Sequence, residues 1–120
     1  MTVFTGIRVL LVEDESAIAM LIEDMLEDLG CKVVASVAHL AKALELAKDL
    51  DIDLAILDVN LAGEYVFPAA HVLRARNIPF FFTTGYGISG LPSEFFDSPV
   101  LPKPFSVADL HAKIKLTARG

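Results

Sequence analysis

The segment IRVLLVEDES (residues 7–16) is apolar over most of its first half and acidic directly afterwards. An apolar run of about six residues that ends at polar residues is typical of a buried β-strand. The next three residues are Glu13, Asp14 and Glu15. Two carboxylates about 5 Å apart repel each other by roughly 3 kcal/mol at an effective dielectric constant near 20. We therefore expect a positively charged partner beside this acidic cluster.

The remainder of the chain alternates apolar runs with segments of helical periodicity. Residues 16–30 carry apolar residues on one helical face and acidic residues on the other, and Gly30 is a suitable helix end. The spacing of Ser106 and Asp109 is that of a capping box at the start of the last helix. Further strands are predicted at 32–37, 53–57, 79–83 and 99–102, and further helices at 39–50, 68–76, 106–119 and, short or irregular, within 85–96.

Five strand–helix pairs with short, nearly continuous apolar strands predict an α/β fold. Strands of this kind form a parallel sheet that is covered by helices on both faces and joined by right-handed crossovers. We expect a doubly wound, flavodoxin-like sheet of five strands in the order 2-1-3-4-5. Ligands of such sheets bind outside the carboxyl ends of the strands, where the winding reverses between the first and third strands. The functional residues are therefore sought in the loops at that edge.

Composition narrows the class of protein. The chain has 120 residues, of which 54% are hydrophobic, and this suffices for one domain, predicted to span 1–120 without an output domain. Its formal net charge of −6 and the lack of a basic block argue against direct nucleic-acid binding. The single cysteine, Cys31, fits a reducing compartment. No stretch resembles a leader or a membrane span, so a cytoplasmic protein without membrane insertion is expected.

Chemically active side chains follow the predicted strands at their carboxyl ends. They are Glu13 and Asp14 after the first strand, Asp58 after the third, Thr83 and Thr84 after the fourth, and Lys103 after the fifth. Several oxygen ligands at one edge favour Mg²⁺, which binds carboxylates together with a phosphate. Lys103 lies between two prolines, which restrict the backbone and aim its ammonium group. A lysine, a hydroxyl and a metal around one carboxylate suit phosphoryl transfer, with Asp58 as the nucleophile.

Four sequence motifs resemble those of the response-regulator receiver domain (CheY-like) family. They are VED (12–14), LDVNLAGE (57–64), TTG (83–85) and KPF (103–105), and they occur in the order and spacing of that family over almost the whole chain. Each motif alone is weak evidence, whereas four in register, each at a strand end, are strong evidence. The loop FFTTGYG resembles that of a subgroup of single-domain receivers from alphaproteobacteria.

The resemblance implies a role for each matching residue. Asp58 corresponds to the phospho-acceptor, and Glu13 and Asp14 correspond to the acidic pair that binds Mg²⁺ with Asp58. The backbone carbonyl of Asn60 corresponds to a further metal ligand. Thr84 corresponds to the hydroxyl that moves toward the phosphoryl group, and Lys103 to the lysine that pairs with it. The family also implies a cis peptide bond between Lys103 and Pro104.

Two positions depart from the family pattern. Receiver domains commonly carry Tyr or Phe three residues before the lysine, where the ring reports phosphorylation, and this chain has Val100. The position four residues after the acceptor aspartate is usually proline, and here it is Ala62. We expect the segment from Gly85 to Gly90 to be mobile and to carry the signal instead, with Tyr86 close to the site.

The sequence thus predicts a stand-alone response regulator, a signalling switch rather than a classical enzyme. A sensor histidine kinase or a phosphotransfer protein would donate the phosphoryl group, and output would pass to an unidentified downstream protein or the domain would act as a phosphate sink. The alternative is a receiver-like binding module that works without phosphorylation. A phosphohydrolase would need an acid where Asn60 stands, and no P-loop motif is present. The three histidines are predicted to lie at surface positions of helices.

Overall fold

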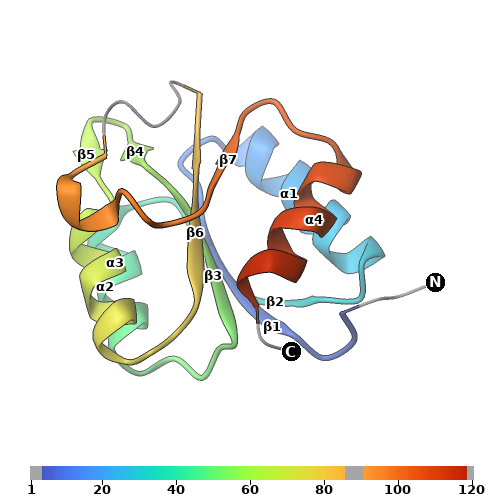
Figure 1. Cartoon of the computed structure of the whole chain (residues 1–120), viewed down its shortest axis with the longest axis horizontal. Coiled ribbons are helices and arrows are strands. Elements are labelled where there is room, and N and C mark those ends of the chain that lie inside the picture. The colour runs from blue at the N-terminus through green and yellow to red at the C-terminus, as the bar shows by residue number, and fades with distance from the viewer. Residues whose placement is uncertain (1–3, 86–90, 119–120) are drawn as a thin grey trace.

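The computed structural model describes residues 4–85 and 91–118 and shows a five-stranded parallel sheet (Figure 1). Its strands are β1 (Arg8–Val12), β2 (Lys32–Val37), β3 (Leu54–Asp58), β6 (Phe80–Thr84) and β7 (Val100–Pro102). They lie in the order β2-β1-β3-β6-β7, and every neighbouring pair is parallel. This confirms the predicted order 2-1-3-4-5 for the five long strands.

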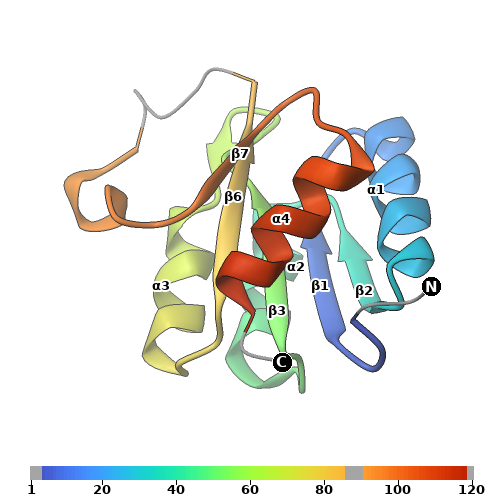
Figure 2. The same ribbon diagram turned by 45° about the vertical axis from the view of Figure 1, so that its right-hand side comes forward.

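Four α-helices cover the two faces of the sheet. They are α1 (Ser16–Asp28), α2 (Leu40–Asp49), α3 (Phe67–Ala75) and α4 (Val107–Thr117). Figure 2 shows α1 and α4 on one side of the sheet and α3 on the other, and the core residues of α2 belong to the same cluster as those of α3. The observed helices agree with the predicted ones to within about two residues at most ends.

The core consists of two apolar layers, one on each side of the sheet. Successive strand side chains point to opposite faces. In β1, Leu10 and Val12 pack toward α2 and α3, whereas Val9 and Leu11 pack toward α1 and α4. All four side chains are fully buried. Burial on both faces explains why the strands read as continuous apolar runs rather than as alternating ones.

The predicted helix-end signals are present. Ser106 accepts a hydrogen bond from the Asp109 N–H, and the Asp109 carboxylate accepts one from the Ser106 N–H, which completes the capping box. Pro68 occupies the first turn of α3, where its missing N–H costs nothing. Gly30 follows α1 with φ 94°, a left-handed conformation that glycine adopts without strain.

The connection between β6 and β7 contains no regular α-helix in its described part. Within its described part, the only helix is the short 3₁₀ helix η1 (Ser93–Phe95). The short or irregular helix predicted within 85–96 is therefore confirmed for its described residues, 91–96. The predicted mobile segment 85–90, Tyr86 included, lies outside the described residues except for Gly85.

A small hairpin after β3 is not predicted by the sequence pattern. Strands β4 (Asn60–Leu61) and β5 (Glu64–Tyr65) pair antiparallel around a two-residue turn. The turn residues Ala62 and Gly63 have φ values of 55° and 98°. Positive φ at both positions is the requirement of a type I′ turn. Proline, whose φ is fixed near −65°, cannot occupy position 62 in this hairpin, which accounts for the departure from the family pattern.

Two further sequence inferences concern the remaining surface and core. Cys31 is buried, and burial raises the pKa of its thiol to about 11, so it behaves as a small apolar residue. Among the described residues, no helix combines the length and the apolar character that a membrane-crossing segment requires.

Candidate functional site

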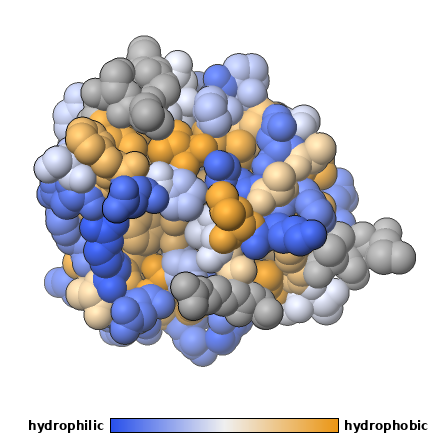
Figure 3. Space-filling view, in the orientation of Figure 1, coloured by the Kyte–Doolittle hydropathy of each residue, from blue (hydrophilic) through white to orange (hydrophobic). Residues whose placement is uncertain are grey.

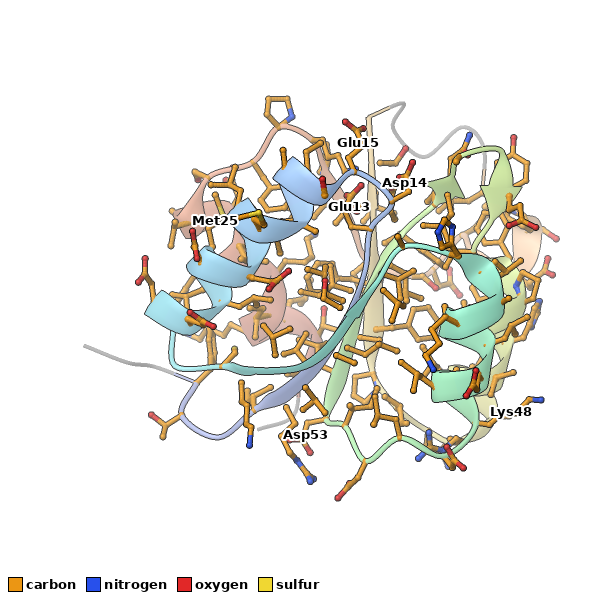
Figure 4. All side chains as sticks on the ribbon, turned by 180° about the vertical axis from the view of Figure 1, so that it is seen from behind. Glu13, Asp14, Glu15, Met25, Lys48 and Asp53 are labelled. Atoms are coloured by element: carbon orange, nitrogen blue, oxygen red, sulfur yellow. The ribbon has the colours of Figure 1, made fainter. Side chains whose placement is uncertain are left out.

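Three acidic side chains gather at the carboxyl edge of the sheet. Figure 4 shows Glu13 and Asp14 together where β1 ends, at the opposite end of the sheet from Asp53. Asp58 is the last residue of β3, which is paired with β1. Carboxylate oxygens of Glu13, Asp14 and Asp58 lie within 4.8 Å of one another. The predicted acidic cluster is therefore formed by neighbouring strands.

Lys103 supplies the positive charge that the acidic cluster requires. Its Nζ lies 2.7 Å from Oε1 of Glu13 and 3.2 Å from Oδ2 of Asp58. The lysine side chain is 17% exposed, so these contacts are only weakly screened by water. The Lys103 backbone N–H donates to the Thr84 carbonyl at 2.9 Å, which ties the lysine to the end of β6. The Lys103–Pro104 peptide bond is cis, as the family resemblance implies.

The Asp58 carboxyl group has a raised pKa. Burial and the negative charge of Glu13 raise its pKa from an ordinary value of 3.8 to about 7, against the opposing effect of the Lys103 ammonium. Burial lowers the pKa of Lys103, but its hydrogen bond to Glu13 and the charge of Asp58 outweigh burial, and the pKa of Lys103 is raised overall. One ammonium therefore does not fully compensate three clustered acids. A divalent cation would supply the missing positive charge.

The acidic side chains differ in how they are held. Glu13 is almost fully buried, and its second oxygen, Oε2, accepts a hydrogen bond from the Glu15 N–H at 3.1 Å. Asp14 is half-buried and therefore reaches solvent. Glu15 is exposed next to the first residue of α1, the surface position predicted for it. The cluster thus combines a buried inner acid with an outer acid that faces water.

Both threonines at the end of β6 are buried at the same edge of the sheet as Asp58. In the sheet register Thr83 is the partner of Asp58, and Thr84 lies one step further toward the edge, paired with Pro102. Thr83 is 1% exposed and Thr84 is 4% exposed. The assignment of Thr84 as the responding hydroxyl stays a prediction because both hydroxyls lie at this edge.

Asn60 lies two residues after Asp58 and opens the hairpin. Its side-chain Oδ1 accepts a hydrogen bond from the Gly63 N–H at 2.7 Å, so the amide group is engaged by its own turn. Asn60 is half-buried. The role predicted for this residue involves its backbone carbonyl and does not depend on the side chain.

An apolar groove next to Lys103 was not predicted from the sequence. Its volume is about 290 Å³, and it is lined by Ile18, Leu21, Ile22, Met25, Lys103, Pro104 and Phe105. Leu21, which lines the groove, is 55% exposed, and Met20 on the same helix is 65% exposed. The sequence does contain a pattern that indicates this groove. Apolar residues of α1 cover more of the helix circumference than burial against one face of the sheet requires. A contiguous exposed apolar patch next to a polar site is typical of an interaction surface.

The three predicted surface histidines are placed as expected or nearly so. His39 and His71 are exposed, and His111 is half-buried with its ring 5.1 Å from the Phe4 ring. None of them belongs to the acidic cluster found among the described residues.

Comparison with known proteins yields one family. The model of the response regulator receiver domain matches residues 9–115 of the chain. Among curated proteins, the chain is 33% identical over 113 residues to the transcriptional regulatory protein PdtaR of Mycobacterium tuberculosis, a match that spans 91% of this chain and 55% of PdtaR. The chain spans about half the length of the first curated relatives that it matches.

Solved structures show the same likeness. SdrG from Sphingomonas melonis superimposes with a TM-score of 0.82 at 45% identity, over 92% of this chain and 94% of SdrG. The receiver domain of the sensor histidine kinase PA1611 from Pseudomonas aeruginosa, solved with a magnesium ion in its active-site cleft, superimposes with a TM-score of 0.76 at 27% identity, over 92% of this chain and 97% of that domain.

Proposed function

This chain belongs to the response regulator receiver domain family, and from that premise we propose that it is a switch controlled by phosphorylation of Asp58. The observation that carries the proposal is the position of Lys103, whose ammonium touches both Glu13 and Asp58 at the carboxyl edge of the sheet. An ammonium in this place neutralises the acids before reaction and the phosphoryl oxygens after it.

The reaction we propose is the transfer of a phosphoryl group from phosphohistidine to Asp58. A carboxylate oxygen of Asp58 attacks phosphorus in line with the P–N bond, the P–O bond forms, and the P–N bond breaks as the imidazole leaves with the bonding electron pair. Solvent then protonates the imidazole. The Lys103 ammonium, now 3.2 Å from Asp58, stabilises negative charge on the equatorial phosphoryl oxygens. Attack of water on the acyl phosphate would later restore Asp58.

The residues present fit a magnesium site. Glu13, Asp14 and Asp58 offer hard carboxylate oxygens within 4.8 Å, and we assign the Asn60 backbone carbonyl as a further ligand. Bound Mg²⁺ would supply charge neutralisation for the phosphoryl oxygens. The magnesium ion in the cleft of the related PA1611 receiver supports this assignment.

Phosphorylation would change the charge at the site and so shift the protein between two states. A carboxylate of charge −1 becomes a group of about −1.5 to −2, with three strong acceptor oxygens. We propose that the Thr84 hydroxyl moves to one of these oxygens. The Lys103 ammonium would leave Glu13 and bind a second phosphoryl oxygen. Thr84 is the last residue of β6, so its movement would change the conformation of the connection between β6 and β7.

The partners we propose are proteins. A sensor histidine kinase or a phosphotransfer protein would present phosphohistidine at the site, and the apolar groove beside Lys103 offers this donor a docking surface. Output would pass to a downstream protein, or the domain would drain phosphate from a shared kinase. That the domain works alone stays a prediction.

We expect the intact protein to gain the mass of one phosphoryl group when it is incubated with acetyl phosphate and Mg²⁺. The gain is expected to disappear in Asp58→Ala and when a chelator removes the metal. Asp14→Asn should need more Mg²⁺ for the same gain, because it replaces a charged carboxylate ligand by a neutral amide oxygen without changing the acceptor. A phosphorylated Asp58→Ala protein would refute the assignment. No gain together with no Mg²⁺ binding would favour the binding module that works without phosphorylation, an alternative that Val100 leaves open.

Thr84→Ala and Thr83→Ala form a matched pair that tests the assigned hydroxyl. We expect Thr84→Ala to be phosphorylated normally but to lose the conformational response, because the responding donor is gone. Thr83→Ala should keep that response. Amide chemical shifts of residues 91–98, recorded with and without beryllofluoride as a phosphoryl mimic, measure the response. The opposite pattern would move the role to Thr83.

A further inference from the structure

A group of aromatic rings connects the site to the segment 91–98. The Tyr65 ring stacks on the Phe67 ring with centroids 5.8 Å apart, and the Phe67 ring stacks on the Phe95 ring at 5.6 Å. Phe82 contacts both Phe67 and Phe95 edge-on, at 5.7 Å and 5.4 Å. We call Tyr65, Phe67 and Phe95 the aromatic ladder.

The Tyr65 end of the ladder lies close in the fold to the proposed phosphorylation site. Tyr65 belongs to β5 and pairs with Asn60, which is two residues from Asp58. Phe82, which contacts two rings of the ladder, pairs with Leu57 and is followed directly by the two threonines. The ladder is therefore connected to the site through both β5 and β6.

The Phe95 end of the ladder anchors the segment 91–98. Phe95 is fully buried, and it is the buried residue of η1. Arg74 of α3 holds this segment from outside: its guanidinium lies 4.4 Å over the Phe95 ring and donates to the Glu94 carbonyl at 2.8 Å and to the Ser98 hydroxyl at 3.1 Å. His71 of α3 contacts the Glu94 carboxylate at 3.2 Å.

Large aromatic side chains are exposed at both ends of the connection between the ladder and this segment. Phe96, the residue after η1, is 66% exposed, and Tyr65 at the other end of the ladder is 55% exposed. Figure 3 shows hydrophobic surface at the upper left, in the region where η1 and the β4–β5 hairpin lie in Figure 1. A shift of Phe95 would rearrange that surface.

Position 100 is poorly suited to signal in this protein. Val100 is half-buried, packs against the core cluster that contains Phe82 and Phe95, and pairs with Phe82 in the sheet. A valine has a single χ1 torsion and is stiff, so it has no ring to swing between buried and exposed positions. Stacked rings in a packed core, by contrast, tend to move between discrete arrangements because close packing resists continuous deformation.

We propose that the aromatic ladder Tyr65–Phe67–Phe95 transmits the modification of Asp58 to the segment 91–98. The inference rests on the proposed function, since it takes Asp58 to be the modified residue. Phe67 is the central rung, because it contacts the ring on the hairpin, the ring on β6 and the ring on η1. Arg74 is the clamp that keeps Phe95 and its segment on α3.

Hydrogen exchange of residues 91–98, read by mass spectrometry with and without beryllofluoride and Mg²⁺, tests the ladder. In the unaltered protein we expect the phosphoryl mimic to change the exchange rate of this segment by at least about threefold, in the range of typical coupling between sites. In Phe67→Leu, which keeps apolar volume and loses the ring, the change in 91–98 should fall below half. Protection around Asp58 should remain. Phe4→Leu, a half-buried ring on the other side of the sheet, is the matched control and should behave like the unaltered protein.

Arg74→Met provides a second variant, at an exposed position outside the core. It removes both hydrogen bonds to the segment, so exchange of 91–98 should already be fast without the mimic, and the mimic should then change it little. A full response of 91–98 in both Phe67→Leu and Arg74→Met would overturn the ladder while leaving the proposed function intact. No protection around Asp58 in the unaltered protein would overturn the proposed function and the ladder with it.

Discussion

Asp58→Asn is expected to raise the free energy of unfolding of the metal-free domain near pH 7.5 by about 2 to 4 kcal/mol. In the folded protein the pKa of Asp58 is raised from 3.8 to about 7, because the carboxylate is buried beside Glu13. Folding therefore favours the protonated form. The stability that Asp58 contributes is fully present below about pH 4 and is lost as the pH rises through 7. Asparagine avoids this loss because it carries no charge.

The measurement is urea denaturation of the unaltered protein and of Asp58→Asn between about pH 4 and 8, in chelator. The difference in stability should be small near pH 4, grow as the pH rises to 7, and level off above it. Taking the difference cancels the titration of the other acids. Asp109→Asn is a control at an exposed carboxylate, whose pKa is lowered by hydrogen bonds with Ser106 and which should give no such gain. A stability difference that shrinks between pH 4 and 7 would contradict the electrostatic description of the site.

Lys103→Met is expected to slow phosphorylation by acetyl phosphate by roughly 10² and to remove the conformational response. Methionine keeps much of the apolar stem but not the ammonium, which lies 2.7 Å from Glu13 and 3.2 Å from Asp58. Both the transferred oxygens and the two acids would lose their positive partner. The rate of phosphoryl mass gain at a fixed, saturating Mg²⁺ concentration measures the effect.

Lys115→Met is the matched control, because Lys115 is an exposed lysine of α4 away from the acidic cluster. Loss of the ammonium leaves the buried acids repelling each other, so the folding of Lys103→Met should be checked near pH 5.5, where Asp58 is largely protonated. Folded Lys103→Met that is phosphorylated at the rate of the unaltered protein would show that the ammonium does not assist transfer.

Much of the fold could be predicted because local signals and burial agree. The strands of this sheet are buried on both faces, so each reads as a short apolar run, and the helices between them carry one apolar face. The hairpin at 60–65 could not be predicted in this way. Its strands have two residues each, and its turn places Ala62 at a φ that alanine seldom adopts, so neither periodicity nor turn composition indicates it.

The candidate site was predicted from the rule that parallel strands present their carboxyl ends at one edge. That rule brings Asp58 and the residues after β1 together, and the structure places their oxygens within 4.8 Å. The rule does not predict which side chains contact each other. The closer contact of Lys103 with Glu13 than with Asp58, and the stacking of Phe67 between Tyr65 and Phe95, depend on rotamers and packing that the sequence pattern does not specify.

The most direct test of the central claim identifies the phosphorylated atom. Protein treated with acetyl phosphate and Mg²⁺ is reduced with borohydride, which converts an acyl phosphate to an alcohol, and fragment masses locate the converted residue. The proposed function predicts conversion at Asp58 alone. Conversion at Glu13 or Asp14, or a phosphoryl group that survives borohydride on a hydroxyl or imidazole, would contradict it.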